Sequence, residues 1–237
     1  MITDKILTEI REHAALTDHR ESCGLIIIVK GKQRYVPCRN IAFHDIDFEI
    51  HPEDYADAED KGTIQYIVHT HHYVNASPSQ VDLINIEKSD VPWLIVNHPT
   101  GAYTITHPTG YVTPLEGRQF IHGSIDCLTL IQDYYKQAMG ISMPDYVRPD
   151  NWWLIDEYNF YDNFYKECGF HKIPLEEIAV GDVIIMRLNS PKNNHGAVYM
   201  GNNVILHHCT NRLSCKDVYG GYWMEVTSYV LRHKDAK

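Results

Sequence analysis

The sequence predicts an α+β protein of two domains, and three observations support this. Helical and strand patterns alternate through the first hundred residues, which is typical of a mixed sheet with flanking helices. Between residues 107 and 118 the pattern gives way to Pro, Thr and Gly, as expected of a linker. The two sides also differ in charge, since residues 1–112 carry 9 Lys and Arg against 16 Asp and Glu, and residues 113–237 carry 12 against 15. We therefore expect domains at 1–112 and 113–237.

Composition narrows the class of protein. Hydrophobic residues make up 44% of the chain and charged residues 22%, which is typical of a soluble globular protein with a buried core. A net charge of −10 argues against non-specific binding to nucleic acid. No run approaches the ~18 apolar residues of a membrane span, and the N-terminus lacks an apolar signal region. We expect a cytoplasmic protein whose six cysteines are mostly free thiols.

The first domain should contain three helices and a mixed sheet. A hairpin turn at residues 30–32 joins the first two predicted strands. Helices are predicted at residues 3–19, 51–60 and 79–88, and strands at residues 25–29, 33–36, 47–50, 64–70, 93–97 and 103–106.

Potential metal ligands follow the predicted strand at 64–70. His69 and His71 are two residues apart, so on a strand their imidazoles point to the same side. Pro78 and Ser79 break the extended path and start a helix, which would bring Asp82 toward the two histidines. Two His and one carboxylate leave one coordination position open, as in catalytic rather than structural zinc sites.

A purely structural interpretation of these residues is also available. Ser79 with Asp82 three residues later is close to a helix N-cap with an acidic first turn, which is common for stability alone. His-x-His pairs also arise by chance in a chain with 15 His.

The full spacing, His-x-His, seven residues, Ser, two residues and Asp, resembles the motif of the JAMM (MPN+) metalloproteases. The resemblance implies an MPN fold and one Zn²⁺ held by His69, His71 and Asp82. It also implies that Glu21 takes a proton from zinc-bound water and that Ser79 helps to stabilise the oxyanion. One departure is His72, where the family usually has Pro, so a fourth imidazole could alter the loop or compete for the metal.

The second domain is organised around Cys127. Leu128, Ile131 and Tyr135 recur at helical spacing, so Cys127 lies in the first turn of a mostly buried helix. A helix N-terminus lowers the pKa of a thiol by stabilising the thiolate. The alternative is a small apolar cysteine that packs under the sheet.

Predicted strands at residues 180–186, 195–200 and 204–208 place His195 and a His pair near this helix. A Cys at a helix start, a His on a strand and a polar orienting residue form a papain-like relay. This arrangement resembles the NlpC-type cysteine peptidases, which cleave peptidoglycan stem peptides. The resemblance implies a papain-like α+β domain with Cys127 as nucleophile, His195 as base and His207 as orienting residue.

Parts of the NlpC pattern match and parts depart from it. Asp126-Cys127 and Gly181-Asp182 match, whereas Leu128-Thr129 replace the usual Ser-Gly. Phe120 occupies the place where these peptidases often carry an oxyanion-hole Tyr, so the partner of the oxyanion stays open.

The turn between the last two strands decides whether His207 or His208 shares the face of His195. A two-residue turn at Asn202-Asn203 would put His208 on that face, and a three-residue loop would put His207 there. Local sequence is nearly neutral between the two, and the NlpC resemblance favours His207. We therefore expect a loop of odd length.

The order of the two domains resembles the tail-tip assembly proteins of lambda-like siphophages. The resemblance implies a role in tail-tip assembly or in opening the host cell wall. Implied partners are tail-tip proteins and, as substrate, peptidoglycan stem peptides. The implied location is the host cytoplasm during assembly or the tail tip of the virion. The alternative is a non-catalytic assembly factor with vestigial peptidase sites.

Overall fold

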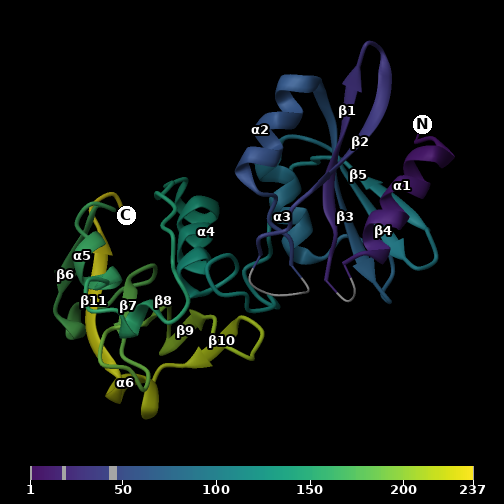
Figure 1. Cartoon of the computed structure of the whole chain (residues 1–237). Coiled ribbons are helices and arrows are strands. Elements are labelled where there is room, and N and C mark those ends of the chain that lie inside the picture. Colours follow the sequence, from purple (N-terminus) through teal and green to yellow (C-terminus); the bar gives the residue numbers. More distant parts are fainter. Residues whose placement is uncertain (1, 18–19, 43–46, 237) are drawn as a thin grey trace. The chain divides into compact units, whose positions relative to one another are not determined.

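The computed structural model describes residues 2–17, 20–42 and 47–236, and the chain divides into two compact units, Met1–Val112 and Thr113–Lys237 (Figure 1). Each unit combines one sheet with helices, which confirms the predicted α+β class. Within the described ranges, no helix has the length and apolar character needed to cross a membrane.

The first unit contains three helices and five strands. In chain order these are α1 (Asp4–Ala15), β1 (Cys23–Val29), β2 (Lys32–Cys38), α2 (Pro52–Lys61), β3 (Thr63–His72), α3 (Gln80–Ser89), β4 (Trp93–His98) and β5 (Tyr103–Thr106). The first helix ends at Ala15, and residues 18 and 19 of the range predicted for it lie outside the described residues. The predicted strand at 47–50 is wrong, because this stretch makes only an isolated bridge between Ile50 and Asn40.

The sheet of this unit is mixed, in the order β2-β1-β3-β4-β5, with β3 and β4 parallel and the other pairs antiparallel. Helix α1 packs on one face, where Ile6 and Ile10 join Val68 in a buried cluster. Helices α2 and α3 lie on the opposite face (Figure 1), where Ala58 and Ile86 contact a cluster that includes Ile67. Strand alternation gives His69 and His71 the same face as Ile67, so both point toward the side of α3.

The second unit is built on a six-stranded antiparallel sheet in the order β10-β9-β8-β7-β11-β6. Helix α4 packs on one face through Leu130, Ile131 and Tyr135, which share a cluster with Val183 and Val198. The elements are α4 (Cys127–Met139), α5 (Phe160–Phe164), β6 (Phe170–Ile173), β7 (Val183–Met186), β8 (His195–Gly201), β9 (Val204–His207), β10 (Cys215–Val218), α6 (Tyr222–Glu225) and β11 (Thr227–His233), with short 3-10 turns at Trp152–Leu154 and Leu175–Glu177.

Candidate active sites

The register between β1 and β3 brings Glu21 to the two histidines of the first unit. Cys23 pairs with His69 in this antiparallel ladder, and the Thr70 N–H donates to the Ser22 carbonyl at 3.0 Å. The pairing thus continues past the end of β1, and Glu21 falls opposite His71. The Glu21 carbonyl is held in turn by the Asn40 side-chain amide at 2.8 Å.

The three predicted metal ligands converge on one point. His69 Nε2 and His71 Nε2 are 3.1 Å apart, and the Asp82 carboxylate oxygens lie 3.4 Å from each of them. In a tetrahedral zinc site with bonds of about 2.0–2.2 Å, neighbouring nitrogen and oxygen ligands are about 3.3–3.4 Å apart. The spacing is close to this: Oδ1 of Asp82 lies 3.4 Å from His69 Nε2, and Oδ2 lies 3.4 Å from His71 Nε2. Glu21 Oε1 lies farther out, 3.8 Å from His71 Nε2.

Protonation in this cluster also fits a cation. His71 Nδ1 lies 2.8 Å from the Asn75 carbonyl, which accepts its proton and directs Nε2 at the cluster. The His69 ring is fully buried and stacks on Phe48 at 4.5 Å, and this burial lowers the His69 pKa. Burial disfavours a charged Asp82, but hydrogen bonds from both histidines hold its pKa below the usual range. Burial disfavours the protonated form of His71, but Asp82, the Asn75 carbonyl and Glu21 outweigh burial and raise the His71 pKa, so the acidic groups favour positive charge here. Imidazole nitrogens and a carboxylate are ligands that zinc accepts.

Glu21 has the surroundings of a proton acceptor that works near neutral pH. Its side chain is 13% exposed, and burial raises its pKa to about 8, with His71 acting in the opposite sense. Glu21, His69 and His71 also lie close enough together to share a metal ion, so Glu21 is placed either to bind the metal or to act as a general base beside it.

Ser79 and Asp82 form a capping box at the start of α3. The Asp82 N–H donates to Ser79 Oγ at 3.1 Å, and the Ser79 N–H donates to Asp82 Oδ2 at 2.7 Å. The structural interpretation of this pair therefore holds, and the same contacts orient Asp82 toward the histidines. His72 is not among the converging residues, since its ring packs beside His98 at 5.1 Å.

In the second unit, a second capping box fixes Cys127 at the first position of α4. The Asp126 carboxylate accepts from the backbone N–H groups of Leu128 and Thr129 at 3.0 and 3.1 Å. Arg148 pairs with Asp126 at 2.7 Å, and both side chains are only 3% exposed. Because Asp126 is locked from two sides, the thiol of the next residue has a defined position.

The environment of Cys127 differs from the expectation of a lowered thiol pKa. Burial raises the pKa of Cys127 to about 11, so the effect of burial exceeds that of the helix start. Three groups act in the opposite direction: the Tyr161 hydroxyl, 3.2 Å from Sγ, the backbone amide of Gly196 and the charge of Arg148. The Tyr161 hydroxyl keeps its proton, because burial raises its own pKa far above the usual range.

Tyr161 lies on the short helix α5 and was not predicted as part of the site. It places a hydroxyl beside the thiol, whereas Phe120 lines the same cavity without one. Sequence spacing carried no signal for Tyr161, because it follows Cys127 by 34 residues in a segment without a motif.

His195 and His207 begin a hydrogen-bonded chain that ends at an arginine. His195 Nε2 lies 3.2 Å from His207 Nδ1, and His207 Nε2 lies 3.0 Å from Asp217 Oδ2. Arg212 binds the Asp217 carboxylate through two nitrogens at 2.8 and 3.0 Å, which holds the Asp217 pKa below its usual range. Asp217 and Arg212 extend the site beyond the residues that the sequence had indicated.

The ionised carboxylate sets the protonation of this chain. Asp217 can only accept, so His207 Nε2 carries a proton, and burial lowers the His207 pKa and keeps that ring neutral. His207 Nδ1 is then an acceptor, and the Nε2–H of His195 donates to it. The lone pair of a neutral His195 is then on Nδ1, where it can accept a proton from a nucleophile.

The hairpin between β8 and β9 places His207 on the face of His195, as predicted, but its turn differs from the predicted one. Gly201 pairs with Val204 across a two-residue turn, Asn202-Asn203, so the predicted loop of odd length is wrong. A β-bulge between Tyr199 and Gly201 shifts the register by one, and Ala197 consequently pairs with His207. The predicted contact of His207 with His195 is therefore present, while His208 packs against Phe120 at 5.1 Å.

Not every matched motif reaches the site. Asp182 of the Gly-Asp pair is buried, and Arg232 donates to both of its oxygens at 2.9 and 2.7 Å. It also accepts from the Ala179 N–H, so it braces the turn into β7. A cavity of about 290 Å³ marks the reactive region instead, and its lining includes Cys127, Tyr161, His195, His208 and Cys209.

The architecture is that of a two-domain protein that joins an MPN-like unit with a papain-like one. Residues 3–107 match the family model of prokaryotic homologs of the JAB domain, and residues 117–232 match the NlpC/P60 family. Tail tip assembly protein K of Escherichia phage N15 is 38% identical over 98% of this chain and 96% of its own length. Its counterpart in Escherichia phage lambda is 36% identical over 77% of this chain and 88% of its own length. The chain belongs to the tail tip assembly protein K family, which confirms the resemblance.

Proposed function

We propose that this protein acts in phage tail-tip assembly and carries two peptidase sites, a zinc-dependent JAMM-type site and a cysteine endopeptidase site for peptidoglycan stem peptides. Family membership supports the tail-tip role, with other tail-tip proteins as partners and the host cytoplasm or the virion tail tip as location. The two family matches support the peptidase class.

The observation that carries the cysteine site is the ordered chain from Arg212 through Asp217 and His207 to His195. It leaves His195 Nδ1 as an acceptor for the Cys127 proton. A thiol with a pKa of about 11 is protonated at neutral pH and therefore needs such a base. The thiolate attacks the scissile carbonyl carbon, and Tyr161 and the Gly196 amide, which contact the thiol, are candidate donors to the developing negative charge. His195 passes its proton to the leaving amine, and water then hydrolyses the thioester and restores the thiol.

The shape of the cavity supports a small peptide as substrate. With a volume of about 290 Å³ and the aromatic side chains of Phe120, Trp152 and Trp153 in its wall, it fits one or two residues of a short peptide. Stem peptides of peptidoglycan are short, branched and accessible, and they are the substrates that the NlpC resemblance implies.

In the first unit, His69, His71 and Asp82 would hold the zinc ion. A bound zinc supplies Lewis acidity that polarises water and a scissile carbonyl. Glu21 accepts the proton of the attacking water and delivers it to the leaving amine, while the Ser79–Asp82 capping box keeps the carboxylate oriented. Its substrate is an amide of peptidoglycan or of a tail protein.

The test is turnover of purified peptidoglycan by the full chain, with products identified by mass. We expect the wild type to release stem-peptide fragments and C127A to release none of the cysteine-site products. E21Q should keep those products and lose any that depend on zinc, and C168A is the matched control for removal of a thiol. Unchanged product release by C127A would overturn the cysteine site. If the wild type releases nothing and C127A/E21Q still supports tail assembly, the protein is a non-catalytic assembly factor.

A further inference from the structure

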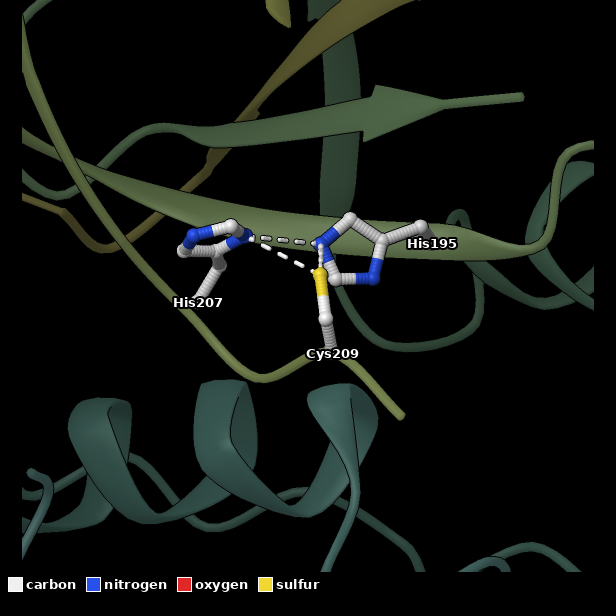
Figure 2. Close-up of side chains that lie close together, drawn as sticks. All are labelled: His195, His207 and Cys209. Carbon is white, nitrogen blue, oxygen red and sulfur yellow. Dashed lines mark hydrogen bonds between the residues drawn. The ribbon is translucent and has the colours of Figure 1, made fainter. Parts of the chain in front are cut away.

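Three potential metal ligands meet beside the cysteine relay. Figure 2 shows the rings of His195 and His207 and the sulfur of Cys209 directed toward one another. The two nitrogens, His195 Nε2 and His207 Nδ1, are 3.2 Å apart, and Cys209 Sγ lies 3.8 and 3.6 Å from them. Tetrahedral zinc, with Zn–N of about 2.0–2.1 Å and Zn–S of about 2.3 Å, separates two nitrogens by about 3.3 Å and nitrogen from sulfur by about 3.6 Å. The measured triangle is close to this one.

The surroundings complete the features of such a site. His207 presents Nδ1 to the cluster because its Nε2 proton is held by Asp217, the carboxylate–histidine arrangement typical of metal ligands. The Trp223 ring packs on His207 at 4.5 Å and covers that side. Cys209 is half-buried and lines the cavity that also contains Cys127, so a fourth ligand can approach from there.

We propose that His195, His207 and Cys209 form a site for zinc, and that an occupied site switches off the cysteine peptidase. Metal binding needs a thiolate, so the Cys209 proton is released to solvent. It also needs the lone pair of His195 Nε2, so the proton on that nitrogen moves through solvent to Nδ1. His195 Nδ1 is then protonated and cannot accept the proton of Cys127. Zinc binding stands on the geometry alone, whereas the inhibition rests on the proposed peptidase function.

The metal site is tested with cobalt(II), because a cobalt–thiolate bond gives a charge-transfer absorption in the near ultraviolet that oxygen and nitrogen ligands do not give. Titrations use the full chain with D82A, which removes one ligand of the first unit, and the thiolate band separates Cys209 from the oxygen and nitrogen ligands that remain there. We expect the band in D82A and its loss in D82A/C209S. The matched control is D82A/C215S, because Cys215 lies with Asp217 on the other side of the His207 ring. Loss of the band in the C215S variant and not in the C209S variant would overturn the site.

A second measurement tests whether bound zinc inhibits the cysteine peptidase. In the D82A chain, saturating zinc should slow alkylation of Cys127 by iodoacetamide at least tenfold, and C209S should remove this protection. Equal rates with and without zinc, in a chain that shows the cobalt band, would refute the inhibitory role. If D82A/C209S fails to fold, D82A/H207Q replaces it in the cobalt titration with the same expected loss. A cobalt band that depends on Cys209, in a chain that never cleaves peptidoglycan, would refute the peptidase and leave the metal site standing.

Discussion

Both candidate sites are built at the start of a helix that carries a capping box, yet they use it differently. At α3 a member of the box is itself a functional group, since Asp82, the third residue of the helix, completes the box and also faces His69 and His71. At α4 the box of Asp126 and Thr129 only frames the reactive group, which is the neighbouring Cys127. The first site therefore depends on local hydrogen bonds, and the second depends on the distant Arg148 as well.

The two sites also differ in how lone pairs and protons are arranged. In the first unit, two imidazole nitrogens and a carboxylate face one point, and the acidic groups there favour positive charge, which a cation can supply. In the second unit, donors and acceptors alternate along the chain of hydrogen bonds from Arg212 through Asp217 and His207 to His195. Convergent acidic groups favour a cation, whereas alternating donors and acceptors favour movement of a proton. The predictions below test this contrast, starting from the largest effect.

Removing Arg148 should cause the largest loss of stability. R148M leaves the Asp126 carboxylate buried without its partner, which costs on the order of 3–5 kcal/mol. Chemical denaturation of the full chain, followed by a signal from the second unit, measures this. K216M is the control, because Lys216 and Glu116 form an exposed pair whose loss should cost less than about 1 kcal/mol. Equal effects of the two substitutions would show that the buried pair does not anchor α4.

Zinc affinity should separate ligand from base in the first unit. D82A removes one of three protein ligands and should weaken zinc binding by about 100-fold or more, whereas E21Q should change it by less than about fivefold. Competition with a chromogenic chelator measures both, in a C209S background so that only this site is titrated. Similar losses in D82A and E21Q would make Glu21 a ligand.

The orienting role of His207 can be separated from that of its neighbour. H207A removes the acceptor for the Nε2 proton of His195, so alkylation of Cys127 at neutral pH should slow by about tenfold or more. H208A should stay within about threefold, although His208 is equally buried. Peptide mass analysis of iodoacetamide-treated, zinc-free protein gives both rates. The reverse ranking would mean that the bulge in the hairpin does not set the working register.

The smallest expected effect is that of Y161F. The Tyr161 hydroxyl favours the thiolate, so its loss should raise the Cys127 pKa further above its usual range. Because the thiolate is the reactive form, the alkylation rate at a given pH falls and its pH profile moves to higher pH by roughly one unit or less. Y199F is the control, since Tyr199 lies outside the lining of the cavity. A profile that does not move would remove Tyr161 from the site.

The sequence by itself determined the groups whose relation is local. His69 and His71 share a face because strand side chains alternate, and Asp82 follows Ser79 by one helical turn, so their spacing predicts their convergence. Cys127 at a helix start is likewise a local consequence of the Asp126 cap. The break in pattern near residue 112 and the mixed sheet also follow from short-range patterns.

Only the tertiary structure decided the rest, because those contacts join residues far apart in the chain. Tyr161 reaches the thiol across 34 residues, and Arg148 reaches Asp126 across 22. The face of His207 depended on a single bulge, since one extra residue in one strand exchanges the two sides of the sheet. Burial decided the Cys127 pKa, and burial is the sum of everything that packs around the thiol rather than a property of the helix that carries it.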